Sequence, residues 1–279
     1  MKQLNIYILS FLLFFTMGVS AQCTFRNTAF NSGEHLSYNL YYNWKFIWVK
    51  AGTASWYTVS SNYNGVPAYR ASLTTRGNNR VDNYFVLRDT LLCYNTKNMV
   101  PLYYRKGARE GKRYTVEEVF YSYHNGVCKV RQHRIGTEGK NYWKDYNSNE
   151  CLYDMMSIFL RARSFNPESW KKGYVVYFPI VDGDSHNEAK IEYKGKKIIK
   201  ADNNIKYNCL ELIYYGYDEK RWKKIATFFV TDDQNHIPIR LDMFLKFGSA
   251  KAFLTSMRGI RNKITSEAVS YTHLRAHET

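Results

Sequence analysis

The chain has 279 residues, of which 45% are hydrophobic and 17% aromatic, and its formal net charge is +16. This composition excludes an intrinsically disordered chain, because such chains have few aromatic residues. The length is sufficient to bury a large core without disulfide bonds. No linker rich in proline or serine and no repeat of fixed period is found in the sequence, which favours one domain over two.

The N-terminal residues 1–21 have the pattern of a signal peptide. Lys2 precedes the apolar run IYILSFLLFF, and the small residues VSA predict cleavage after Ala21. The run is shorter than the stretch of about 20 apolar residues that a membrane-spanning helix requires. Cys23 suggests a lipoprotein, but Gln22 stands before it, where the lipidation signal has a small residue. We therefore expect an exported protein that begins at Gln22 and works in the periplasm or outside the cell.

Alternation of apolar and polar residues predicts that most of the chain forms β-strands. Between Leu36 and Trp44 every second side chain is apolar, and a longer run of the same kind follows Ile237. The expected strands are 36–44, 66–76, 99–107, 112–123, 127–135, 174–181, 186–193, 205–217, 222–231 and 237–247. Asn-Gly pairs and other glycine-containing stretches predict tight turns at 64–65, 125–126, 181–184 and 193–196. Strands joined by tight turns form an antiparallel sheet.

One segment has helical periodicity. Its apolar residues recur at helical spacing and are Leu152, Met155, Met156, Phe159 and Leu160. Ser148 or Asn149 is the expected N-cap, and Arg161 and Arg163 lie near the negative end of the helix dipole. A shorter helical turn is expected around 81–87. Because the sheet is the only large apolar surface available, we predict a mainly β protein: a large curved antiparallel sheet, an open or half barrel, with this helix packed on one face.

The C-terminal residues 269–279, VSYTHLRAHET, have no apolar period and resemble the translation of a sequencing adapter. The alternative is a natural disordered tail. In either case the tail lies outside the fold, and its deletion should leave thermal stability unchanged. Residues 22–268 then form a single β-rich domain.

Six sequence blocks, in order along residues 28–265, carry a family resemblance. They are AFNSGEHLSYNLYYNWKFIWVKAGTASW, VLRDTLLCY, KGAREGKRYTVEEV, CLYDMMSIFLRAR, FPIVDGD and HIPIRLDMFLKFGSAKAFLTSMRGIRN. The chain resembles the exported family called domain of unknown function 3108. This resemblance implies a mainly antiparallel β-fold in a Gram-negative envelope and no particular activity. A curved sheet that carries a helix is also similar, at the level of the fold alone, to periplasmic lipoprotein carriers.

The sequence contains no known catalytic, phosphate-binding or dinucleotide-binding motif, so we expect neither enzymatic activity nor a cofactor. The histidines have no regular mutual spacing, which favours turn or surface roles over metal binding; they are His35, His124, His133, His186 and His236. Asp182, Asp184 and Glu188 lack the order of a calcium loop and are interpreted as an acidic hairpin end.

The cysteines are Cys23, Cys93, Cys128, Cys151 and Cys209. An odd number in an oxidising compartment leaves at least one thiol unpaired or in an intermolecular bond, and the pairing stays open. Cys151 stands at the start of the predicted helix, where the dipole lowers the pKa of a thiol. No histidine is near it in the sequence, which argues against a catalytic role for Cys151. A hydrolase is the third hypothesis, because no catalytic motif supports it.

Basic residues gather at expected hairpin ends. The stretch RKGAREGKR contains Arg109, Lys112 and Arg113, and further clusters are KGKKIIK, KRWKK and RGIRNK. If two clusters share a face, they would attach the protein peripherally to an anionic membrane or glycan. If they point in different directions, they would mainly keep the protein soluble. We take Arg109, Lys112 and Arg113 as candidate residues for an anionic surface, and nucleic acid is not an expected partner of an exported protein.

Three tryptophans lie close together in NWKFIWVKAGTASW, residues 43–56. A chain reversal within 45–52 would leave Trp48 and Trp56 near the rim of the sheet. Tryptophan suits half-exposed positions, so Trp44, Trp48 and Trp56 are candidate ligand contacts. Ordinary core packing is the competing interpretation.

The leading hypothesis is a non-enzymatic, exported envelope protein that handles an apolar or amphiphilic ligand, such as a lipid, on the concave side of its sheet. The alternative is a structural or interaction protein that uses an exposed aromatic and basic surface for a glycan or a protein partner. A deep apolar cavity would favour the first hypothesis, and a filled core would favour the second.

Overall fold

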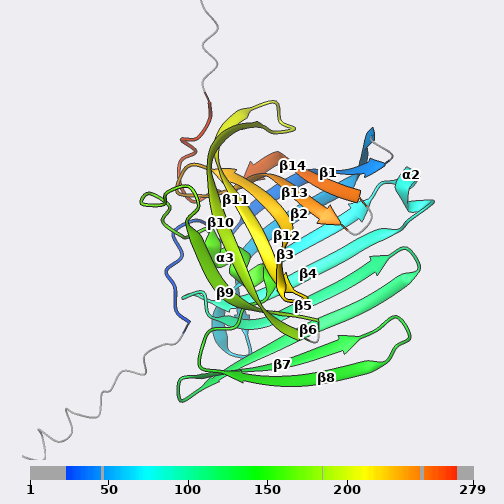
Figure 1. Ribbon diagram of the computed structural model, residues 1–279, viewed down its shortest axis with the longest axis vertical. Coiled ribbons are helices and arrows are strands. Elements are labelled where there is room, and N and C mark those ends of the chain that lie inside the picture. The colour runs from blue at the N-terminus through cyan, green and yellow to red at the C-terminus, as the bar shows by residue number, and fades with distance from the viewer. Residues whose placement is uncertain (1–22, 45–46, 184, 246–247, 269–279) are drawn as a thin grey trace, which may run out of the picture.

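A single antiparallel sheet of 14 strands dominates the molecule (Figure 1). The computed structural model describes residues 23–44, 47–183, 185–245 and 248–268. The sheet order is β8-β7-β6-β5-β4-β3-β2-β1-β14-β13-β12-β11-β10-β9. The strands are β1 (Glu34–Trp44), β2 (Ile47–Tyr63), β3 (Val66–Gly77), β4 (Leu87–Thr96), β5 (Pro101–Glu110), β6 (Arg113–His124), β7 (Val127–Ile135), β8 (Asn141–Ser148), β9 (Val175–Asp182), β10 (Ser185–Lys200), β11 (Lys206–Asp218), β12 (Arg221–Thr231), β13 (Pro238–Leu245) and β14 (Gly248–Arg258).

The sheet curls into a half barrel. Consecutive strands are hydrogen-bonded neighbours, except that β14 returns to pair with β1 and that β8 and β9 form the two ends of the order. Figure 1 shows the β9–β10 hairpin reaching across toward β5 and β6. Gln132 Nε2 on β7 donates hydrogen bonds to the carbonyl oxygens of Gly183 (3.0 Å) and Ser185 (3.3 Å). The end of this hairpin is therefore held against the far half of the sheet.

The predicted mid-chain helix is α3 (Met155–Ala162), which lies in the connection from β8 to β9. Its N-cap is Asp154, whose side chain accepts hydrogen bonds from the backbone nitrogen and hydroxyl of Ser157 (2.8 and 2.6 Å). The prediction of Ser148 or Asn149 as the cap was wrong, because Tyr153 first pairs with β9: it donates to Pro179 and accepts from Val181. The helix can begin only after this contact.

Helix α3 packs on one face of the sheet, as predicted, and contacts β4, β5 and β9. This face is the concave one (Figure 1). Met156 and Leu160 are fully buried with Trp56 in the main core, and Ile158 is buried in a second cluster with Phe178. Met155 does not share this burial and is 46% exposed, because it is the first residue of the helix. The half of the concave face nearest α3 is thus filled by side chains.

Most predicted strands correspond to observed ones, but two local predictions were wrong. The stretch 193–196 is not a turn: β10 runs through it with a bulge at Lys194, directly before Gly195 (φ +110°), which pairs with Glu211 of β11. The helical turn expected around 81–87 is α2 (Asn79–Asp82), and β4 begins at Leu87. Strands β2, β4, β8 and β14 are not predicted; β8 in particular is an exposed edge strand without apolar alternation.

The predicted chain reversal within 45–52 occurs between β1 and β2. Residues 1–22 and 269–279 lie outside the described residues, so the expected signal peptide and tail carry no structural observation. None of the helices in the described ranges is long and apolar enough to span a membrane.

Candidate functional site

The concave face changes from apolar to charged toward the hairpin ends of β5, β6 and β7. Lys106, Glu117 and Arg134 lie opposite one another in register across these three strands. Lys106 Nζ is 4.0 Å from Glu117 Oε2. Side chains two residues apart on a strand share a face, and the preceding inward row contains the buried Tyr104 and Gln132. The strand period therefore directs the three charged side chains toward the interior.

Two polar atoms in the deeper row have no hydrogen-bond partner in the described part of the protein. They are the hydroxyl of Tyr104 and Oε1 of Gln132, on residues that are 3% and 1% exposed. Buried polar atoms normally find a partner in protein, water or ligand, because leaving them unpaired is unfavourable. Burial raises the pKa of Tyr104 well above its ordinary value, so this hydroxyl keeps its proton and can donate a hydrogen bond.

A cavity of about 610 Å³ lies at the ends of the β5–β6 and β7–β8 hairpins. We call it the polar mouth; it is lined by Ala108, Glu110, Arg113, Thr115, Arg134, Gly136, Thr137, Glu138, Lys140 and Tyr142. Its volume is in the range of small-molecule sites, but such sites are usually mostly apolar. Charged side chains of both signs dominate this lining. The mouth therefore suits a charged or zwitterionic group better than a hydrocarbon chain.

Asp89 adds a titratable carboxyl group to the same face. It pairs in register with Ala108, which lines the polar mouth. Burial and the nearby Glu110 carboxylate raise the pKa of Asp89 to about 6, although Lys106 acts in the opposite direction. Asp89 therefore takes up a proton just below neutral pH, and the region becomes more positive as the pH falls.

The three candidate tryptophans do not form one site. Trp56 is 4% exposed and packs against Phe159 of α3 with ring centroids 4.9 Å apart, so the expectation of a rim position was wrong for this residue. Trp48 is 38% exposed at the start of β2, with Lys251 Nζ 4.1 Å from the ring centroid. Trp44 ends β1, and its side chain lies outside the described set.

The candidate basic residues lie where the sequence predicts them. Arg109, Lys112 and Arg113 are exposed at the end of the β5–β6 hairpin, and Arg113 also lines the polar mouth. The cluster KRWKK begins at the end of the β11–β12 hairpin, whereas KGKKIIK lies along β10 and not at a hairpin end.

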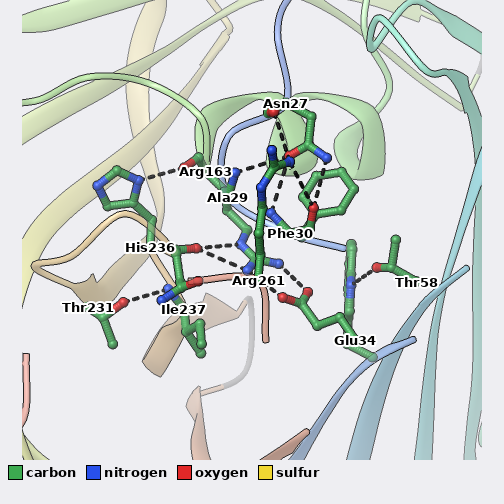
Figure 2. A network of polar contacts seen from close by, with 12 residues as sticks. Asn27, Ala29, Phe30, Glu34, Thr58, Arg163, Thr231, His236, Ile237 and Arg261 are labelled. Atoms are coloured by element: carbon green, nitrogen blue, oxygen red, sulfur yellow. Dashed lines mark hydrogen bonds and ion pairs between the residues drawn. The ribbon is translucent and has the colours of Figure 1, made fainter. Parts of the chain in front are cut away.

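A buried polar network lies at the end of the half barrel opposite the polar mouth. Figure 2 shows Arg163 at the end of α3 against Glu34 at the start of β1. The Arg163 Nη1–Glu34 Oε1 and Nη2–Oε2 distances are 2.5 and 2.8 Å. Arg163 also donates to the carbonyl oxygen of Asn235 (3.0 and 3.2 Å). His236 Nδ1 donates to the carbonyl oxygen of Arg163, and burial lowers the pKa of this histidine. The network joins α3 to β1 and to the β12–β13 connection, and its role is structural.

His133 is hydrogen-bonded, and the free cysteines of the described part of the chain are buried. The ring nitrogens of His133 lie 2.8 Å from Glu118 Oε2 and 2.8 Å from Asn141 Oδ1. Three thiols are free and buried, namely Cys93, Cys128 and Cys209. Burial raises the pKa of Cys93 well above its ordinary value and that of Cys209 to about 12, which makes them weak nucleophiles. Among the described residues there is no cluster of three metal-ligating side chains; Asp184 lies outside them.

Cys151 forms a disulfide bond with Cys23, 128 residues away in the sequence. The sulfur atom of Cys151 is therefore not available as a nucleophile in this structure. It joins the N-terminal segment to the connection that carries α3. The bond also uses the sulfur atom of Cys23 that lipidation would modify.

The family model for Protein of unknown function (DUF3108) matches residues 37–255. The chain belongs to this family. A comparison with curated proteins finds no match.

Solved structures also resemble this DUF3108 chain. One is a beta-barrel-like protein of domain of unknown function DUF1849 from Brucella abortus, with a TM-score of 0.54, 11% identity, and coverage of 84% of this chain and 100% of that chain. At this identity the similarity concerns the fold alone. A protein from Parabacteroides distasonis, described as a candidate lipoprotein, has a TM-score of 0.32 and 11% identity over 85% of this chain and 100% of its own. That score supports no further comparison.

Sequence reasoning missed the polar mouth. Tyr142 lies in β8 and Lys140 directly precedes this strand, which apolar alternation cannot detect because its side chains are mostly exposed. One usable signal was present. The Asn-Gly turn at 125–126 fixes the register of β6 against β7, and with it the pairing of Glu117 and Arg134.

Proposed function

We propose that this DUF3108 member is an exported, non-enzymatic protein of the cell envelope that binds the polar head of an amphiphilic ligand in the polar mouth. One observation carries the proposal: an inward-facing charged row, Lys106, Glu117 and Arg134, stands beside a cavity of about 610 Å³. Charge-assisted hydrogen bonds from such a row recognise phosphate, carboxylate or ammonium groups. Behind it, the hydroxyl of Tyr104 and Oε1 of Gln132 offer further hydrogen bonds.

The filled core argues against uptake of a whole acyl chain. Met156 and Leu160 of α3 pack with Trp56 of β2 over the concave face, and each of these side chains is at most 4% exposed. Protein interiors of this kind leave little volume for a guest chain. The proposal therefore assigns only the head of the ligand to the mouth and leaves its apolar part outside the sheet.

Export is supported by two independent features. Residues 1–21 have the signal-peptide pattern, and Cys23 and Cys151 form a disulfide bond. Disulfide bonds persist in oxidising compartments such as the periplasm and are rare in the cytosol.

A glycan is the second candidate ligand. Tyr142 is 49% exposed and lines the mouth beside Arg134, Glu138 and Lys140. An exposed aromatic ring with adjacent hydrogen-bonding groups can stack on a sugar. This alternative agrees with the filled core, and it requires no apolar part in the ligand.

The test is a titration with three soluble probes: dihexanoyl phosphatidylglycerol, dihexanoyl phosphatidylethanolamine and an oligomer of N-acetylglucosamine. We expect a phospholipid probe to bind and Arg134→Gln to weaken binding about tenfold or more, since a charged hydrogen bond is lost. Lys129→Gln is the matched control, because Lys129 is exposed on the outer face of the same strand. Binding of the sugar alone would favour the second candidate, and binding of none of the probes would contradict both.

A further inference from the structure

Exposed apolar side chains cluster at the ends of two adjacent hairpins. At the start of β2, Ile47 is 66%, Trp48 38% and Val49 40% exposed; at the end of β13, Phe244 and Leu245 are each 48% exposed. Strand β1 pairs with both β2 and β14, so the β1–β2 and β13–β14 ends are neighbours. We call these five residues the apolar rim. Figure 1 shows both ends on the same side of the molecule as α2.

The apolar rim is apolar on both faces of the sheet. Val49 pairs with Tyr42, Tyr42 with Ala250, and Ala250 with Met243. Val49 on β2 therefore lies on the same inward face of the sheet as Met243 and Leu245 on β13. Trp48 and Phe244 alternate to the outer face, where lysine side chains approach them. A protein partner seated on one face would leave the other exposed. A lipid interface surrounds an inserted hairpin end and covers both faces.

The next connection, from β3 to β4, extends the same edge. Tyr84 is 93% and Phe85 49% exposed. Asn78 fixes this connection to β2, because its backbone nitrogen donates to Ala51 O (2.9 Å) and its side chain donates to Lys50 O (2.5 Å). Exposed apolar side chains therefore lie at three neighbouring hairpin ends, the two that form the apolar rim and the β3–β4 connection.

Positive charge surrounds the apolar rim. Lys251 Nζ lies 4.1 Å from the ring centroid of Trp48, and Lys224 Nζ lies 4.6 Å from that of Phe244. The flanking β5–β6 end carries Arg109, Lys112 and Arg113 against Glu110. The opposite flank, the β11–β12 end, carries Lys220, Arg221, Lys223 and Lys224 against Asp218 and Glu219. Both flanks have a surplus of basic side chains, which complements anionic lipid headgroups.

We infer that this end of the half barrel is a docking surface for an anionic phospholipid membrane. The apolar rim enters the interfacial region, where tryptophan and other amphipathic rings are preferred. The lysines and the flanking basic ends contact the headgroups. The inference goes beyond the proposed function, because it assigns a second contact to residues outside the polar mouth. The mouth lies at hairpin ends of the same sheet edge, next to the β3–β4 connection, where Gly111 N donates to Val86 O.

The experiment is vesicle co-sedimentation of the exported, processed protein, together with its tryptophan fluorescence. The vesicles are equal parts phosphatidylglycerol and phosphatidylethanolamine, or phosphatidylcholine alone. We expect the wild type to bind the anionic vesicles at low salt, with a blue shift of the fluorescence, and to lose binding at high salt. The double variant Trp48→Ser, Phe244→Ser should bind the anionic vesicles at least about tenfold more weakly than the wild type.

The matched control is Trp143→Ser, since Trp143 is 51% exposed on the edge strand β8, outside the apolar rim. It should bind as the wild type does, and all three proteins should bind the soluble probes of the polar mouth equally. Charge reversal of Arg109, Lys112 and Arg113 to Glu should also reduce binding at low salt. Equal sedimentation of the rim variant and the wild type would overturn the inference. So would a wild type that does not bind anionic vesicles, or one that self-associates through the apolar rim without binding vesicles.

Discussion

Arg163, the C-cap residue of α3, and Glu34, the first residue of β1, form a bidentate ion pair across 129 residues of sequence. Their side chains are 2% and 0% exposed. Burial opposes the charged guanidinium, but the Glu34 carboxylate outweighs it and raises the pKa of Arg163. The guanidinium of Arg163 therefore stays charged inside the protein. The ion pair fixes the end of α3 on the sheet (Figure 2).

Replacing Arg163 by Met should lower the free energy of unfolding by about 3–5 kcal/mol, because Glu34 is left buried without its partner. The double variant Glu34→Met, Arg163→Met should recover a large part of this loss, since the uncompensated charge is gone. Urea denaturation measures both. The control is Lys140→Met, which removes a partner of Glu138 from an exposed pair and should change stability by less than about 1 kcal/mol. A loss for Arg163→Met as small as that control would disprove the structural role of the pair.

Leu160→Ala should destabilise the protein by about 2–5 kcal/mol, because Leu160 is 0% exposed and its removal leaves a cavity between α3 and the sheet. Leu160→Asp should prevent folding, since it buries an unpaired carboxylate. Met155→Ala in the same helix is the matched control, because Met155 is 46% exposed. Thermal denaturation compares the three. Equal melting temperatures for Leu160→Ala and Met155→Ala would mean that α3 does not pack as described.

Asp89 should make stability depend on pH in a specific direction. Its pKa of about 6 in the folded protein lies above the ordinary value of 3.8, so the folded state binds more protons between these values. Stability therefore falls as the pH rises through this window and stays lower above it. Asp89→Asn should raise the melting temperature at neutral pH and lose this advantage near pH 3.8. The control is Asp145→Asn, because Asp145 is exposed. A gain in melting temperature from Asp89→Asn that is the same at every pH would refute the raised pKa of Asp89.

The disulfide bond closes a long loop, since Cys23 and Cys151 are 128 residues apart. Its loss should cost about 4–5 kcal/mol if chain entropy dominates. Cys23→Ser and Cys151→Ser should each lower the melting temperature, and the double variant should be no less stable than either. A reductant should lower the melting temperature of the wild type and leave that of the double variant unchanged. Unequal effects of the two single variants would show that one cysteine has another role.

The strands and hairpins could be predicted from sequence because their signals are local. Apolar alternation identifies β1 and β13, and Asn-Gly turns join β2 to β3 and β6 to β7. The start of α3 could not be predicted, because it depends on the pairing of Tyr153 with Pro179 and Val181. The bulge before Gly195 has the same glycine signature as a turn, and only the pairing of β10 with β11 distinguishes the two structures.

The candidate site was less predictable than the fold. The basic residues at 109–113 lie at a hairpin end, as their glycine-rich stretch predicts. The polar mouth depends instead on side chains from four strands, β5 to β8, that meet only once these strands pair in register. Trp48 and Trp56 are close in sequence, but they lie on opposite faces because Ala51 forms a bulge between them.

The central claim is that the polar mouth holds the head of an amphiphilic ligand. Native mass spectrometry of protein purified from envelope extracts tests it most directly, with wild type, Arg134→Gln and Lys129→Gln prepared in parallel. The account predicts that wild type and Lys129→Gln carry a bound lipid with a charged head, and that Arg134→Gln carries much less of it. The account is contradicted if the wild type has only its bare mass, or if the same amount of lipid remains on Arg134→Gln.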